Sequence, residues 1–175
     1  MKRTKYIALG GILSALSVVI LYISSLLPGY AIPAAAVSGL LTAAAVIHGG
    51  RKGISLGCAV FAVSAIISLL ILPQKNAAIW YLFIFGHYGV TKSAIERISR
   101  VALEWAAKAA VYTAAFFILY AFLPKAFAAL TDLIPFGLVS VYFVGIAVFA
   151  LYDIGFSRLI GLYLRRVARS FGKEE

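Results

Sequence analysis

Long apolar runs separated by proline and glycine are the feature that most constrains this chain. A helix that crosses a membrane needs about 20 mostly apolar residues, and such runs follow one another along the whole sequence. They cover residues 6–27, 31–48, 54–72, 77–91, 105–123 and 135–157. Pro28, Gly49, Pro73 and Pro124 stand at their ends, where residues that stop or start helices are expected. The pattern predicts an all-α, polytopic integral membrane protein, with residues 1–175 forming a single bundle of six transmembrane helices.

Composition supports a membrane location over an aqueous one. Of the 175 residues, 63% are hydrophobic and 13% are charged, whereas ordinary soluble domains are about 45–50% apolar and about 25% charged. A soluble domain of this size lacks the interior to hide so many apolar side chains. Composition therefore excludes a water-soluble enzyme and a disordered chain.

The basic residues predict how the bundle lies in its membrane. Of the sixteen lysines and arginines, only Lys75 and Lys125 fall in loops on one side, and the other fourteen lie on the opposite side. The positive-inside rule places those fourteen in the cytoplasm, so both termini and the tail 158–175 are expected there, in a cell membrane. The helix of the last run is expected to continue to Arg169. Anionic lipid then explains the net charge of +10, and no nucleic-acid partner is expected. The first run is longer than the apolar core of a signal peptide and is interpreted as a retained anchor.

The sequence lacks the side-chain combinations that most enzyme mechanisms need. Asp153 is the one acid within an apolar run, so two carboxylates cannot share a proton at one membrane depth. Cys58 is the only cysteine, which excludes an intrachain disulfide and every multi-cysteine metal site. We therefore predict no catalysis, no metal and no cofactor.

The two histidines stand near the predicted cytoplasmic ends of their runs. His48 and His87 lack the spacing of a zinc-binding motif and have no nearby carboxylate in sequence. They are expected to be interfacial polar residues. The glycines around them, in His48–Gly50 and Gly86–Gly89, are expected to mark helix ends at the lipid boundary.

A stripe of small residues runs along the first predicted helix. Ala8, Gly11 and Ala15 recur at helical spacing, and small residues at this spacing let two helix backbones approach closely in lipid. Two interpretations stay open: the stripe packs against another helix of this chain, or it is a docking surface for a different membrane subunit.

Alternating charges lead from the cytoplasm into the fifth run. They recur every four residues as Lys92, Glu96, Arg100, Glu104 and Lys108. Pairs at this spacing stabilise a helix by about 0.2–0.5 kcal/mol each, so one continuous amphipathic helix is expected over 91–104. Ile95 and Ile98 belong to its apolar face, which rests on lipid or contacts a partner.

Two ionisable residues are expected at membrane depth. Lys108 and Asp153 each lie a few residues inside the cytoplasmic end of an apolar run. Because an unpaired charge in the membrane interior is costly, we predict that they form a structural ion pair between spans five and six.

Polar and aromatic residues gather at the predicted outer ends of the runs. They are Tyr30, Lys75, Asn76, Trp80 and Tyr81, and Asn76 is the only asparagine. They either form an interfacial aromatic belt or line a substrate-binding pocket with few polar anchors.

A family resemblance is carried by Ile7–Leu16, by the prolines at 28 and 33, and by Pro73–Lys92. In these features the chain resembles the substrate-binding S components of energy-coupling factor (ECF) vitamin transporters. The resemblance implies capture of a vitamin-like small solute from the outer face. It also implies docking of Gly11 and Ala15 on a transmembrane coupling subunit, with energy supplied by a separate ATPase pair. None of the signatures of a riboflavin, thiamine or biotin binder is present.

Two other classes of function remain open. One is a non-catalytic membrane scaffold of the cell-envelope or sporulation machinery, and the other is an uncharacterised membrane enzyme. A ligand-sized cavity favours the transporter subunit, whereas a filled bundle interior favours the scaffold.

Overall fold

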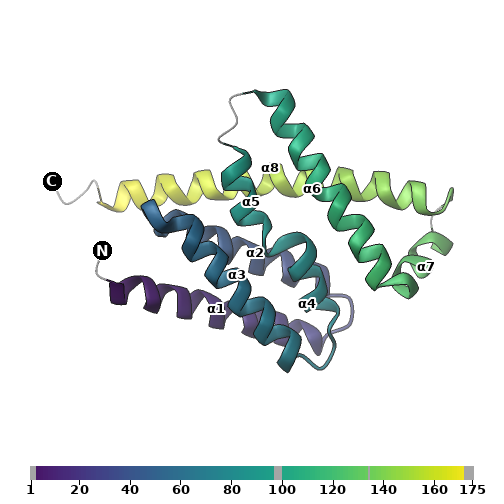
Figure 1. Cartoon of the computed structure of the whole chain (residues 1–175), viewed down its shortest axis with the longest axis horizontal. Coiled ribbons are helices and arrows are strands. Elements are labelled where there is room, and N and C mark those ends of the chain that lie inside the picture. The colour runs from purple at the N-terminus through teal and green to yellow at the C-terminus, as the bar shows by residue number, and fades with distance from the viewer. Residues whose placement is uncertain (1–2, 97–99, 134, 172–175) are drawn as a thin grey trace. The chain divides into compact units, whose positions relative to one another are not determined.

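The computed structural model describes residues 3–96, 100–133 and 135–171, and within these ranges it contains helices and turns but no strand (Figure 1). Two compact units make up the chain, Met1–Phe122 and Leu123–Glu175. The first unit contains α1 (Arg3–Ser25), α2 (Ala31–His48), the 3₁₀ turn η1 (Gly50–Lys52), α3 (Gly53–Ile71), α4 (Asn76–Trp80), the π-helical turn η2 (Tyr81–Phe85), α5 (Tyr88–Ile95) and α6 (Val101–Phe122). The second unit contains α7 (Pro124–Leu133) and α8 (Leu138–Phe171), which contact each other. The prediction of an all-α protein is confirmed.

The first three helices pack on one another along most of their length (Figure 1). Their interior is made of small residues: Ser17, Ser38 and Ser64 are fully buried, and Ala45 and Val60 join a small apolar cluster. Small side chains allow the helix backbones to approach closely, which increases the dispersion contacts between them.

The predicted fourth span is a helix interrupted by a π-helical turn. In sequence order, α4, η2 and α5 continue with a short turn at Gly86 and His87, and all three contact α2. A side chain at Gly39 of α2 would place its Cβ 2.5 Å from the Phe85 carbonyl oxygen. At Gly89 a Cβ would lie 2.8 Å from the Ala43 backbone nitrogen. Glycine at these two positions therefore lets α2 and the interrupted helix touch backbone to backbone.

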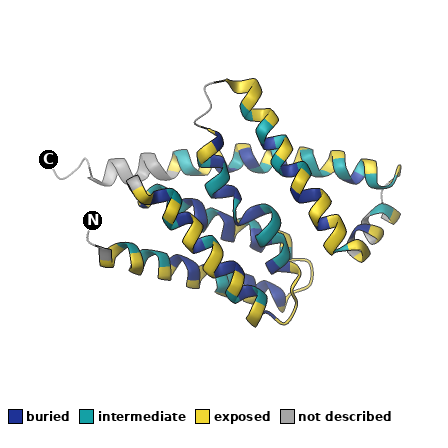
Figure 2. Ribbon diagram, viewed as in Figure 1, coloured by how far each residue is buried: buried dark blue, intermediate teal, exposed yellow. Residues whose placement is uncertain are grey.

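Five of the described helices are long and apolar enough to cross a membrane by length and composition. They are Thr4–Ser25, Ala31–His48, Gly53–Ile71, Val101–Phe122 and Leu138–Leu162. Large apolar side chains point outward from them, with Ile7 74% and Leu70 76% exposed. In Figure 2 these helices each carry an exposed side and a more buried side. Such surfaces are compatible with a multi-pass membrane protein.

Two predictions about helix boundaries differ from the structure. The segment 77–91 was expected as one span, but the π-helical turn divides it. The continuous helix expected over 91–104 is wrong, because α5 ends at Ile95 and α6 begins at Val101. Other boundaries are confirmed: α2 ends at His48, and α8 continues past Arg169.

Candidate functional site

A pocket of about 330 Å³ lies between the interrupted helix and α6. It is formed entirely within the first unit, by Leu82, Phe83, His87, Thr91, Val111, Ala114, Ala115 and Ile118. Its volume is near the lower end of the range of small-molecule sites, about 300–1,000 Å³. The lining is apolar except for one imidazole and one hydroxyl. It has the composition expected of a site that binds a small molecule with few polar contacts.

The π-helical turn positions the histidine of this pocket. The Gly86 N–H donates a hydrogen bond of 2.6 Å to the Tyr81 carbonyl, five residues earlier, which widens the helix by one residue. A side chain at Gly86 would bring a Cβ to 2.7 Å from that same carbonyl oxygen. Below this turn, His87 Nδ1 lies 3.3 Å from the Leu82 carbonyl oxygen. π-Bulges are frequent at functional sites, so the π-helical turn beside the pocket favours a functional role for the pocket.

The neighbouring side chains hold the polar groups of the pocket in place. The Thr91 hydroxyl donates to the His87 carbonyl oxygen at 3.0 Å. The His87 ring meets Phe61 of α3 edge-on, with ring centroids 6.1 Å apart. Phe83 stacks on Phe122, with ring centroids 5.2 Å apart. Aromatic pairs at these separations favour defined orientations, so the pocket has shaped walls.

A cluster of buried hydroxyl groups lies on the α2 side of the π-helical turn. Tyr81 is fully buried, and its hydroxyl lies 3.1 Å from the Thr42 hydroxyl. The Ser38 hydroxyl donates to the Ser17 carbonyl at 3.4 Å, while the hydroxyls of Ser17 and Ser68 have no hydrogen-bond partner among the described residues. The Tyr81–Thr42 contact ties the π-helical turn to α2 and fixes one wall of the pocket.

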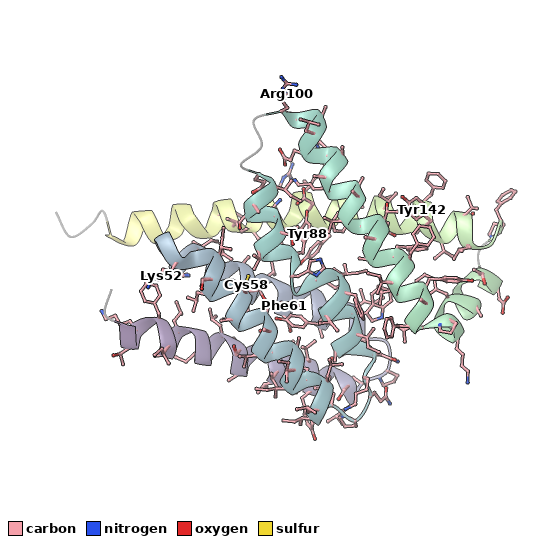
Figure 3. All side chains as sticks on the ribbon, in the orientation of Figure 1. Lys52, Cys58, Phe61, Tyr88, Arg100 and Tyr142 are labelled. Carbon is pink, nitrogen blue, oxygen red and sulfur yellow. The ribbon has the colours of Figure 1, made fainter. Side chains whose placement is uncertain are left out.

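A cluster of four charges lies at the end of α5 and in the first turns of α6. Lys92 lies 2.6 Å from Glu96, and Lys108 lies 2.7 Å from Glu104 and 3.9 Å from Glu96. Both lysine side chains are only 3% exposed. The predicted i,i+4 pairs at both ends of the charge series are confirmed, but they belong to two separate helices, α5 and α6. Arg100, directly before α6, is exposed (Figure 3).

The residues predicted to bind substrate do not line this pocket. Tyr30, Lys75 and Asn76 are exposed, and Lys75 Nζ donates to the Leu70 carbonyl oxygen at 3.3 Å. Trp80 is half-buried, and Tyr81 belongs to the hydroxyl cluster described above. Their role in binding stays a prediction.

The residues predicted to bind a partner are divided between surface and interior. Ala8, Gly11 and Ala15 are exposed, and a Cβ built on Gly11 meets no atom within 4 Å. At Gly10, by contrast, a Cβ would meet Leu56 of α3 at 3.2 Å. Within this structure the internal helix contacts of α1 therefore involve Gly10 and not the Gly11 face.

The remaining predicted contact residues are Ile95 and Ile98 for a partner and Lys108 and Asp153 for an ion pair. Ile95 is buried and so belongs to the interior, while Ile98 lies outside the described residues. The predicted pair of Lys108 with Asp153 would join the two units, and it stays a prediction. Within the first unit Lys108 pairs with Glu104 and Glu96.

Sequence reasoning named His87 but did not place it in a pocket. The segment Gly86–Gly89 was expected to mark a helix end at the lipid boundary. The structure has a helix end there, because η2 ends at Phe85 and α5 begins at Tyr88, and its place at the lipid boundary stays a prediction. The close spacing of two glycines around a histidine is the signal that could have identified the turn. Thr91 and the α6 lining carry no recognisable sequence signal.

Within the described part of the chain, no group of three or more His, Cys, Asp or Glu side chains could hold a metal ion. Comparison of the chain with protein-family models, with curated proteins and with solved structures finds no match.

Proposed function

We propose that this chain is a membrane-embedded, non-catalytic subunit that captures a small solute for a transporter and docks on a separate energising module. The single observation that carries the proposal is the pocket between the π-helical turn and α6. It combines a ligand-sized volume with apolar walls and two polar anchors, His87 and Thr91. The apolar lining with few polar anchors agrees with the solute capture that the resemblance to ECF S components implies. The two anchors lie toward the predicted cytoplasmic end of the fourth span, however, and not at the outer end near Asn76 where the pocket was expected.

The proposed membrane arrangement keeps six crossings, with both termini in the cytoplasm of a cell-membrane protein. Five helices have the length and apolar character of spans. An uninterrupted α-helix with the number of residues in Asn76–Ile95 would span about 30 Å at 1.5 Å per residue, which is the thickness of the hydrocarbon core, and we propose that the interrupted helix is the sixth crossing. Fusions of alkaline phosphatase and green fluorescent protein to each end test this arrangement. Fluorescence without phosphatase activity at both ends is expected, and active phosphatase at one end alone would overturn it.

The exposed face of α1 supports docking on a transmembrane coupling subunit. Gly11 and Ala15 leave a shallow, unfilled surface between larger exposed residues such as Ile12 and Leu16. In lipid, such a surface favours close packing of a second helix. An ATPase pair bound to that coupling subunit would then supply energy.

Purification of the full chain in mild detergent tests capture and docking separately. Mass spectrometry of the eluate is expected to show a bound small molecule together with a coupling subunit and an ATPase pair. Ala114→Phe fills the pocket from an exposed position and is expected to remove the small molecule while the partners remain. Unchanged recovery of the small molecule would refute the assignment of the pocket.

Docking has its own pair of variants. Ala15→Leu is expected to abolish co-purification of the coupling subunit, because the added side chain keeps a second helix away from α1. Ala62→Leu makes the same change at an exposed position of α3 and serves as the control, with no expected effect. If both variants retain the partner equally, α1 is not the docking helix.

The alternative is a membrane scaffold that binds proteins and no solute. One observation favours it: the interior shared by α1, α2 and α3 is filled with small residues, among them Ser17, Ser38 and Ser64. A scaffold would retain its protein partners, and its role in the cell, when Ala114→Phe fills the pocket. Loss of transport in that variant with the partners still bound would reject the scaffold.

A further inference from the structure

The two polar side chains of the pocket indicate which hydrogen-bonding groups a bound solute needs. His87 Nδ1 lies 3.3 Å from the Leu82 carbonyl oxygen. A carbonyl oxygen can only accept a hydrogen bond, so Nδ1 carries the ring proton. In the neutral imidazole the other nitrogen, Nε2, then bears a lone pair and acts as an acceptor. Among the described residues no hydrogen bond to Nε2 is found.

The Thr91 hydroxyl, the second polar group of the pocket, also offers the solute a hydrogen-bond acceptor. The Thr91 hydroxyl already donates to the His87 carbonyl at 3.0 Å, so its remaining capacity is to accept. His87 and Thr91 thus both present hydrogen-bond acceptors to the pocket. His87 and Thr91 are part-buried, so a bound solute without a donor would cover these acceptors and leave them unpaired, which is unfavourable.

The lining also restricts the charge of the solute. The eight lining residues include no lysine, arginine, aspartate or glutamate. The nearest cation in sequence, Lys92, is paired with Glu96 at 2.6 Å. A carboxylate or phosphate would therefore lose its hydration without gaining a countercharge, and an ammonium group would as well.

We infer that the pocket takes a small, uncharged, largely apolar ring compound that donates an N–H or O–H hydrogen bond to His87 Nε2, with Thr91 as a second acceptor. The inference deepens the proposed function and rests on it. Phe83 gives the pocket lining an aromatic surface, and Phe61 meets the His87 ring edge-on from outside the lining. Flat rings pack well against such surfaces.

Three probes separate the parts of this inference. Indole has a ring N–H, benzofuran has the same shape without the donor, and indole-3-carboxylate adds a negative charge. Equilibrium dialysis of the full chain in detergent, with empty micelles subtracted, measures saturable binding of each. One net hydrogen bond corresponds to a roughly three- to tenfold tighter affinity for indole than for benzofuran. The carboxylate is expected to bind more weakly than either.

A pair of histidine variants shows whether His87 is the acceptor. His87→Phe is expected to lower the affinity for indole to that for benzofuran and to leave benzofuran unchanged. His48→Phe is the matched control, because His48 Nδ1 also contacts a carbonyl oxygen of its own helix, at 2.8 Å, yet lies outside the pocket. It is expected to preserve the preference for indole.

Four other results would each contradict either the inferred class of solute or the proposed function. Equal saturable binding of indole and benzofuran would overturn the donor requirement while the proposed capture of a solute stands. Tighter binding of indole-3-carboxylate would show a protonated imidazole and overturn the uncharged class. If no probe binds saturably and Ala114→Phe still removes a co-purified solute, the inference about ring compounds is wrong. If Ala114→Phe has no effect either, the proposed function fails with it.

Discussion

Close contact between α2 and the π-helical turn makes a sharp prediction about Gly39. An alanine there would place its Cβ 2.5 Å from the Phe85 carbonyl oxygen and 3.0 Å from the Phe85 carbonyl carbon. Ordinary contact begins at 3.4 Å, so the two backbones must separate by about 0.9 Å. The obstructing atoms belong to the backbone and cannot move aside as a flexible side chain does. Overpacking of this kind costs about 1–3 kcal/mol.

Gly11→Ala on α1 supplies the control for Gly39→Ala. Alanine is about 1 kcal/mol more favourable than glycine within a helix, and this gain applies to both variants. At Gly11 nothing lies within 4 Å of the added Cβ, so the propensity gain stands alone. The stability of Gly39→Ala is therefore expected to fall about 1–3 kcal/mol below that of Gly11→Ala.

Equilibrium unfolding of the full chain in mixed detergent measures the difference. Trp80 precedes the π-helical turn directly and provides a fluorescence signal near the perturbed contact. Gly89→Ala, which would meet the Ala43 backbone nitrogen at 2.8 Å, is expected to behave as Gly39→Ala does. Equal stability of Gly39→Ala and Gly11→Ala would refute the backbone contact between α2 and the turn.

The remaining predictions concern the polar contacts around the pocket. Tyr81→Phe and Thr42→Val are each expected to destabilise the first unit, and a double-mutant cycle of the two is expected to show a coupling of about 0.5–1.5 kcal/mol from their 3.1 Å hydrogen bond. Additive effects would show that the hydroxyls do not interact. Glu104→Gln is expected to destabilise more than Glu96→Gln in thermal unfolding, because each carboxylate has one close lysine (Lys108 at 2.7 Å and Lys92 at 2.6 Å) but the Glu104 side chain is 21% exposed and that of Glu96 is 44% exposed, so water and salt screen the Glu96 pair more. The reverse order would contradict the described charge cluster.

The charge series illustrates why local patterns predicted partners but not helix continuity. Lys92 and Glu96 pair within α5, and Glu104 and Lys108 pair within α6, as i,i+4 spacing predicts. The spacing is equally compatible with one long helix or with two helices folded back at a turn. The end of α5 at Ile95 and the contact of Lys108 in α6 with Glu96 distinguish them. That contact depends on how α5 and α6 pack.

The stripe on α1 shows the same limit. Gly10 and Gly11 are adjacent small residues, and the sequence offers no means of telling which one faces α3. In the structure Gly10 lies against Leu56, and Gly11 is exposed. The rotation of a helix about its axis is set by the shapes of its neighbours, and local composition does not encode it.

The lengths and apolar character of the helices follow from the sequence alone, because proline and glycine act locally and the need for about 20 apolar residues is a property of the solvent. The pocket required the tertiary structure. Its histidine is positioned by a π-helical turn, and that turn lies against Gly39 of a different helix, distant in sequence. A local sequence pattern does not predict that contact, because only the packing of α2 against the turn brings the two backbones together.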